Sequence, residues 1–192
     1  MVTQRGGNVR VCAVRGNFDD AQTGVKALFA DETLKAFLKK AGYTFSSANS
    51  INFGRLIPQV AYYIYAYAKL AADGKIADGE EINFVVPTGN FGNILAGYYA
   101  KRMGLPVKKL ICASNGNNVL TDFFNKSVYD ANRPFHKTMS PSMDILISSN
   151  LERLLFEVTG RDDAQVRAWM EALKTKVFWA SSVTWRRKSA YR

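Results

Sequence analysis

Apolar residues change their period on either side of a glycine-rich stretch at 88–93. Residues 82–86 form a short apolar run rich in β-branched side chains, which is typical of a buried strand. Pro87 has no amide hydrogen to give to a strand ladder and ends it. From Ile94 onward the apolar residues recur at helical spacing. The pattern predicts a strand, a glycine loop and the start of a helix, in that order.

The same reading extends along the chain. A strand, a helix and a second strand between residues 82 and 113 make a βαβ unit, so a parallel sheet is expected. The helix at about 57–72 has little polar face and is expected to be largely buried. The other predicted elements are a strand at 8–14, helices opening at 19 and 31, a strand at 107–113, and helices opening at 119, 150 and 162.

The glycine loop has the features of an anion-binding site. The first amides of a helix have no internal partners, and the helix dipole adds partial positive charge there. Gly89 and Gly92 permit positive φ, which would let successive N–H groups point into one concavity. The loop matches neither a P-loop nor the G-x-G-x-x-G dinucleotide fingerprint. The residue types leave two interpretations open: a site for a small phosphate group, or a tight turn with an Asn cap.

Composition and charge narrow the class of protein. The chain has 192 residues, of which 47% are hydrophobic and 22% charged, as in an ordinary globular domain. The net charge is +10, but six basic residues and no acid fall between 174 and 192. Elsewhere the two signs are interspersed, as on a solvated surface, so nucleic acid is not an expected partner.

Few residues are available for metal or disulfide chemistry. Cys12 and Cys112 lie far apart in apolar runs, which suggests buried free thiols in a reducing compartment. His136 is the only histidine, and no metal site is predicted. The longest apolar run, 60–68, is too short to cross a bilayer, and no signal peptide is visible, so we expect a cytoplasmic protein with no membrane partner.

Five ordered motifs resemble those of threonine synthase, a pyridoxal-phosphate (PLP) enzyme of the tryptophan-synthase-β, or type II, fold. They come in the family's order and cover roughly residues 5–170. The resemblance implies an α/β fold with a mainly parallel sheet and helices on both faces, incomplete in this chain. The motifs are Gly16–Gln22, Ser47–Arg55, Val86–Asn93, Ala113–Asn117, and Pro141–Ile145 with Asn150–Arg153.

The resemblance also implies a reaction, that of a PLP-dependent carbon–oxygen lyase acting on phosphate. O-phosphohomoserine and water give threonine and phosphate, with PLP as the electron sink. Three residues match the segment that grips the substrate's phosphate, a task that suits the arginine fork. They are Asn49, Ser50 and Arg55. Five match the loop that holds the cofactor's phosphate: Gly89, Asn90, Phe91, Gly92 and Asn93.

Residue types alone leave more ordinary roles open for several of these positions. Asn49 and its neighbours would serve as helix caps, and Arg55 as a surface cation. Asn115 and Asn117 follow a strand and would serve as turn residues. We interpret the segment 142–144 as structural.

The chain also departs from the family pattern. The family's Schiff-base lysine precedes the segment that matches Gly16–Gln22, and no lysine here matches it, so no catalytic residue is predicted. We interpret residues 1–48 as a remnant of the smaller domain, 49–174 as the core of the larger PLP-binding domain, and 175–192 as an unassigned basic tail. We expect this chain alone to be inactive and prone to self-association. The alternative is a non-catalytic module that binds PLP phosphate or another anion, or an inactive fragment.

Overall fold

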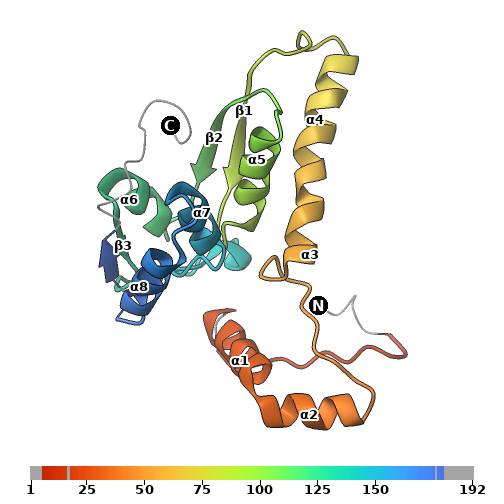
Figure 1. Cartoon of the computed structure of the whole chain (residues 1–192), viewed down its shortest axis with the longest axis vertical. Coiled ribbons are helices and arrows are strands. Elements are labelled where there is room, and N and C mark those ends of the chain that lie inside the picture. The colour runs from red at the N-terminus through yellow and green to blue at the C-terminus, as the bar shows by residue number, and fades with distance from the viewer. Residues whose placement is uncertain (1–5, 17, 176, 180–192) are drawn as a thin grey trace. The chain divides into compact units, whose positions relative to one another are not determined.

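The structure is a computed structural model that describes residues 6–16, 18–175 and 177–179 (Figure 1). The chain divides into two compact units, Met1–Ser46 and Ser47–Arg192. The domain roles assigned above to residues 1–48, 49–174 and 175–192 stay predictions, and most of the basic tail lies outside the described residues.

The first unit is built on two helices, α1 (Phe18–Ala30) and α2 (Glu32–Lys40). The Asp31 carboxylate caps α2 by accepting from the amide of Leu34 at 2.9 Å, so this predicted helix start is confirmed. The strand predicted at 8–14 is wrong. Only an isolated antiparallel bridge joins Gly6 and Val9, because no other described segment lies alongside to complete a ladder. Cys12 is accordingly exposed rather than buried.

The second unit contains the predicted βαβ unit. Strand β1 (Ile82–Pro87) pairs in parallel with β2 (Val107–Ala113), and helix α5 (Gly92–Arg102) connects them. The ladder runs one residue past Pro87, since the amide of Thr88 donates to the carbonyl of Ala113 at 2.8 Å. Cys112, on β2, is half-buried, and burial raises the pKa of its thiol.

The remaining elements of this unit are helices, two 3₁₀ turns and one antiparallel pair of strands. Strand β3 (Val128–Asp130) pairs antiparallel with β4 (Val177–Trp179). The helices are α3 (Phe53–Leu56), the 3₁₀ turn η2 (Ile57–Gln59), α4 (Val60–Ala72), α6 (Val119–Lys126), the 3₁₀ turn η3 (Pro141–Met143), α7 (Leu151–Val158) and α8 (Asp163–Leu173). No helix in the described part of the chain combines the length and apolarity that a membrane span needs.

Helix α5 lies at the centre of the hydrophobic core. It contacts α4, α7 and β2, and its residues Ile94, Leu95 and Ala96 are at most 1% exposed. Gly97 lets α4 approach closely, because a Cβ atom there would lie 2.7 Å from the ring of Tyr63. The buried apolar face of α7, with Leu154 and Leu155 at 0% exposure, completes this core.

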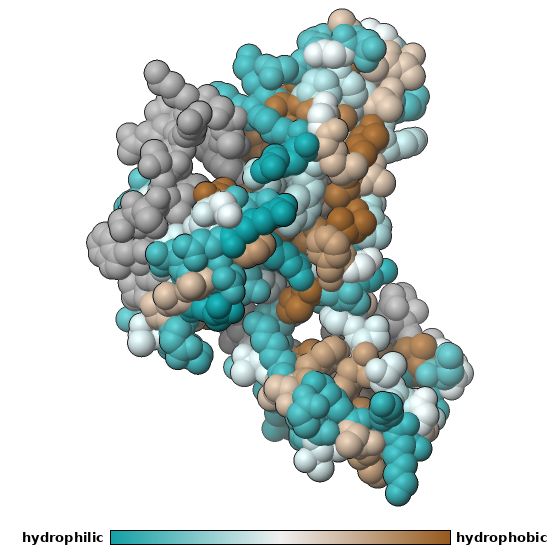
Figure 2. Space-filling view, viewed as in Figure 1, coloured by the Kyte–Doolittle hydropathy of each residue, from teal (hydrophilic) through white to brown (hydrophobic). Residues whose placement is uncertain are grey.

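Helix α4 departs from the prediction that it is largely buried. Val60, Tyr63 and Tyr67 are buried, whereas Tyr62 is 61% and Tyr65 71% exposed. Figure 2 shows apolar residues gathered along the side of this unit where α4 lies. The helix is apolar almost all round, but only its α5-facing side finds a described neighbour.

Candidate functional site

The predicted phosphate loop connects β1 to α5. After Thr88 the chain runs through Gly89 and Asn90, and α5 begins at Gly92. Phe91 precedes the helix in the left-handed conformation with φ +66° and is 1% exposed. A non-glycine residue in this region is uncommon and carries backbone strain, which the burial of its ring offsets.

The two glycines were predicted to adopt positive φ, but their role in the structure is a different one. Neither Gly89 nor Gly92 has a positive φ; within the loop that conformation falls on Phe91. Both permit close packing instead. A Cβ atom on Gly92 would lie 2.3 Å from Ser50 Oγ, and one on Gly89 would lie 3.0 Å from Ile145 Cδ1. The glycines therefore let two distant segments lie directly on the loop.

Several backbone amides of the loop remain available. The amide of Gly92 donates to the side-chain oxygen of Asn90 at 3.1 Å, which closes the turn. The other amides of the loop and first turn have no acceptor among the described residues. They are those of Gly89, Asn90, Phe91, Asn93 and Ile94. Asn93 is exposed at the helix start, so its amide lies at an end of α5 that a ligand can reach.

The side chain of Asn93 is fixed from the neighbouring helix. The Tyr63 hydroxyl lies 2.8 Å from Asn93 Oδ1 and 2.9 Å from the Asn93 carbonyl, and donates to one of them at a time. Burial raises the pKa of the Tyr63 hydroxyl well above its ordinary value, so it remains a donor at neutral pH. Helix α4 thereby holds the first turn of α5.

Ser50 is the predicted substrate residue that meets the loop. It is 7% exposed, and its Oγ accepts from Asn90 Nδ2 at 3.2 Å and from Asn150 Nδ2 at 3.0 Å. Asn150 is fully buried, and both its backbone and its side-chain nitrogen donate to the Asn90 carbonyl, at 3.0 and 3.1 Å. The helix predicted to open at 150 is α7, but the Asn150 side chain makes no capping bond and ties two loops together instead.

The other two predicted substrate residues make contacts within their own segment. The side-chain oxygen of Asn49 accepts from the amide of Ile51 at 3.0 Å, which is a local turn. Arg55 is exposed on α3, and its Nε donates to the carbonyl of Ala48 at 3.3 Å. Their predicted roles at the substrate's phosphate stay predictions.

Arg153 is a residue of this site that residue types did not single out. Its Nη1 donates to the carbonyl of Ser50 at 2.8 Å and its Nη2 to that of Ile51 at 2.5 Å. Nη1 also donates to Asn150 Oδ1. The half-buried guanidinium therefore clamps the 50–51 backbone against the start of α7. The only signal in the sequence was its position at the end of the motif Asn150–Arg153.

A second polar cluster braces the loop that follows β2. The buried carboxylate of Asp144 accepts from the Thr138 amide at 2.8 Å and from Asn115 Nδ2 at 2.7 Å and Asn117 Nδ2 at 3.2 Å. These bonds, that from the Thr138 amide first, hold the pKa of Asp144 below its ordinary value. The interpretation of 142–144 as structural agrees with these contacts, as does a turn role for Asn115 and Asn117. Close by in the sequence, the Ser148 hydroxyl donates to the Gly89 carbonyl at 2.5 Å and so bonds directly to the glycine loop.

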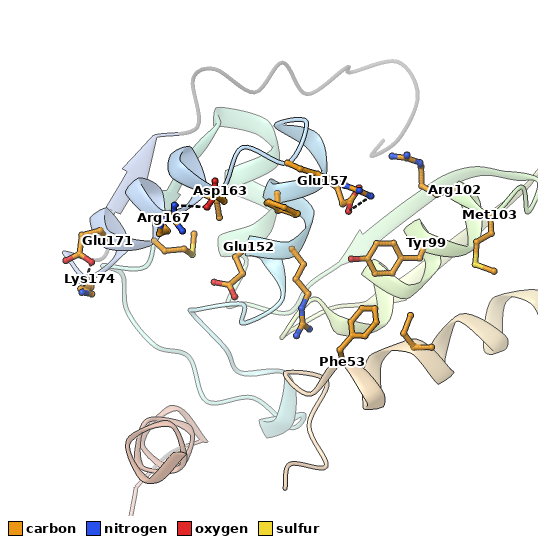
Figure 3. A pocket seen from close by; sticks show the side chains of 16 residues that line it. Phe53, Tyr99, Arg102, Met103, Glu152, Glu157, Asp163, Arg167, Glu171 and Lys174 are labelled. Atoms are coloured by element: carbon orange, nitrogen blue, oxygen red, sulfur yellow. Dashed lines mark ion pairs between the residues drawn. The ribbon is translucent and has the colours of Figure 1, made fainter. Parts of the chain in front are cut away.

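A groove of about 990 Å³ lies beside Arg153, between α3, α5, α7 and α8 (Figure 3). Its lining mixes apolar side chains such as Phe53 and Tyr99 with charged ones. The charged residues include three ion pairs: Glu157 with Arg161, Asp163 with Arg167, and Glu171 with Lys174. Arg153 Cζ lies 5.9 Å from the centre of the Phe53 ring, so this side chain faces both the groove and the Ser50 segment. The groove is not lined by the Gly89–Asn93 loop and is a separate feature.

Comparisons with known proteins place this arrangement in a fold class. A PLP-bound threonine synthase from Brucella melitensis superposes with a TM-score of 0.76 at 45% identity, over 92% of this chain and 36% of that one. The yeast threonine synthase superposes with a TM-score of 0.72 at 38% identity, over 92% of this chain and 35% of that one. The α/β fold is that of the type II PLP-dependent enzymes, as predicted.

The sequence comparisons agree. The chain is 45% identical over 174 residues to threonine synthase of Pseudomonas aeruginosa, covering 91% of this chain and 35% of that protein. It is 51% identical over 151 residues to human threonine synthase-like 1, covering 78% of this chain and 20% of that protein. No family model matches. The chain belongs to the threonine synthase family and spans between a fifth and about a third of the length of these relatives.

Proposed function

We propose that this chain supplies the phosphate-binding parts of a threonine synthase, which converts O-phosphohomoserine and water to threonine and phosphate with PLP. In this proposal the amides at Gly89–Asn93 hold the cofactor's phosphate. Ser50, with Asn49 and Arg55, binds the phosphate of the substrate. When bound, PLP supplies an electron sink for negative charge that develops beside the substrate's amino group.

The residues of the loop fit the phosphate of such a cofactor. The start of an eleven-residue helix combines amides that lack protein acceptors with the positive end of the helix dipole. The single observation that carries the proposal is the 3.2 Å hydrogen bond between Asn90 Nδ2 and Ser50 Oγ. It joins the loop proposed for one phosphate to the segment proposed for the other, as two ligands that react together require.

A non-catalytic anion-binding module is the second candidate, and the placement of the lysine nearest in sequence to the Gly89–Asn93 loop favours it. Lys101 lies in the last turn of α5, at the opposite end from the loop, and its Nζ donates to the carbonyl of Lys108 at 3.2 Å. Both candidates need the same phosphate-binding loop, Gly89–Asn93. They differ in whether this chain contributes a reactive lysine.

Phosphate binding at the Gly89–Asn93 loop is tested by placing a negative charge there without disturbing helix α5. Asn93→Asp retains Oδ1 as the acceptor for Tyr63, and a carboxylate in the first turn favours the helix. We expect it to raise the Kd for pyridoxamine 5′-phosphate by about tenfold through repulsion, with no fall in melting temperature. Pyridoxamine 5′-phosphate is used because its amine forms no imine with surface lysines.

The matched control is Asn83→Asp, the same change at an exposed position near the other end of β1. It should leave the Kd unchanged. Equal affinity in wild type and Asn93→Asp, or an equal loss in both variants, would show that the ligand's phosphate binds elsewhere.

A further inference from the structure

The inference concerns how the Ser50 hydroxyl is oriented, and it rests on the function proposed above. A hydroxyl oxygen has two acceptor sites and one hydrogen. Both acceptor sites of Ser50 are occupied by side-chain amides, those of Asn90 at 3.2 Å and Asn150 at 3.0 Å. The hydroxyl hydrogen is therefore the only part of this group that still needs a hydrogen-bond partner.

No described acceptor takes this hydrogen at ordinary distance. Asn49 Oδ1 lies 3.5 Å from Ser50 Oγ, beyond the usual range for a hydroxyl donor, and that oxygen already accepts from the Ile51 amide at 3.0 Å. Ser50 is thus held as a donor without a strong protein acceptor. A phosphate oxygen would supply one.

The orientation of Asn150 depends on Arg153. A carboxamide can present either its oxygen or its nitrogen in a given direction, and the network decides which. Arginine has only donors, so the Asn150 oxygen must face the guanidinium that bonds it. The nitrogen then faces Ser50 Oγ and the Asn90 carbonyl. In the reversed orientation the amide oxygen would face the Asn90 carbonyl, another acceptor.

The same guanidinium fixes the backbone of the segment. Nη1 and Nη2 reach the successive carbonyls of Ser50 and Ile51, 103 and 102 residues away in the sequence. A planar fork can make these bonds at once, whereas a lysine ammonium lacks the matching geometry. We propose that Arg153 is a positioning residue that, with Asn150, holds the Ser50 hydroxyl as a preset donor to the substrate's phosphate.

The test uses the full chain saturated with pyridoxamine 5′-phosphate and measures the Kd for O-phosphohomoserine. Arg153→Lys should raise this Kd by about tenfold, the usual effect of losing one well-placed hydrogen bond, while the Kd for pyridoxamine 5′-phosphate stays unchanged. Asn150→Asp keeps the acceptor for Arg153 but removes the donor to Ser50 and to the Asn90 carbonyl, and should also raise the Kd for O-phosphohomoserine. Arg167→Lys is the matched control, an exposed α8 arginine paired with Asp163, and should change neither Kd.

A double-mutant cycle separates positioning from a general loss of structure. In a Ser50→Ala background, Arg153→Lys should cause little further loss of O-phosphohomoserine affinity, because the hydroxyl it positions is gone. Additive losses, or an unchanged Kd in Arg153→Lys alone, would overturn the inference.

A second readout keeps the inference testable if the wild-type chain binds neither ligand, a result that would contradict the proposed function itself. Amide hydrogen exchange in segment 47–53 should then be faster in Arg153→Lys than in wild type and in the Arg167→Lys control. Equal protection in all three would show that Arg153 does not position this segment.

Discussion

Asn90 and Ser50, forty residues apart in the sequence, meet where the carboxamide of Asn90 donates to Ser50 Oγ at 3.2 Å. Gly92 lies directly beside this contact, and Asn150 joins it from α7. The loop at the start of α5 is therefore part of one network with the segment that precedes α3.

The close approach of Gly92 to Ser50 predicts a steric cost for any side chain. Gly92→Ala places a Cβ atom 2.3 Å from Ser50 Oγ, so the Ser50 segment must move. We expect a loss of about 1–3 kcal/mol in unfolding free energy, measured by urea titration. Adding Ser50→Gly should recover part of it. Gly24→Ala, within α1 and with nothing near its Cβ position, is the control and should not destabilise the chain.

The Tyr63 hydroxyl predicts a stability effect that depends on pH. Tyr63→Phe removes the donor to Asn93 and should cost about 1 kcal/mol near pH 7. Because burial raises the folded-state pKa of Tyr63 above its unfolded value near 10, its contribution is fully present below pH 10. It is lost as the pH rises above 10, where only the unfolded chain ionises. Urea midpoints at alkaline pH should therefore fall less steeply in Tyr63→Phe than in wild type, and Tyr62→Phe, at an exposed position, should not reproduce this difference.

We predict that replacing Arg55 affects activity much more than stability. Its side chain is exposed and makes one long bond to Ala48, so Arg55→Ala should change the unfolding free energy by less than about 0.5 kcal/mol. In a full-length relative with the same Asn-Ser-x-Asn-x-x-Arg motif, alanine at the matching arginine should cost about 2–4 kcal/mol in kcat/KM. A loss smaller than about tenfold would move the phosphate role to another residue.

From the placement of the lysines we predict that this chain alone does not make threonine. Several are held in surface ion pairs, among them Lys35 with Glu32 and Lys69 with Asp73. Lys101, at the end of α5 away from the loop, donates to the carbonyl of Lys108 on β2. Treatment with PLP and borohydride, followed by mass spectrometry, should give scattered and substoichiometric labelling. One lysine labelled stoichiometrically, together with phosphate release from O-phosphohomoserine, would contradict this.

Local patterns predicted the β1–loop–α5 unit well, because a β-branched run, Pro87 and a helical period specify neighbouring residues. They misjudged the glycines. The conformation of Gly92 is ordinary, and the need for glycine comes from Ser50, which is remote in sequence. Arg153 was missed for the same reason, since its two backbone partners lie more than a hundred residues away. The exposed side of α4 was misjudged because burial depends on neighbours that a helix's own sequence does not specify.

The buried carboxamide of Asn150 gives this site a built-in spectroscopic reporter. Its nitrogen donates to Ser50 Oγ and to the Asn90 carbonyl, while the side chain itself is shielded from water. The two side-chain amide hydrogens should therefore exchange slowly and give separate signals in a nitrogen-edited NMR spectrum. One faces each of the two loops, so a ligand at either loop should shift these signals without any label being introduced.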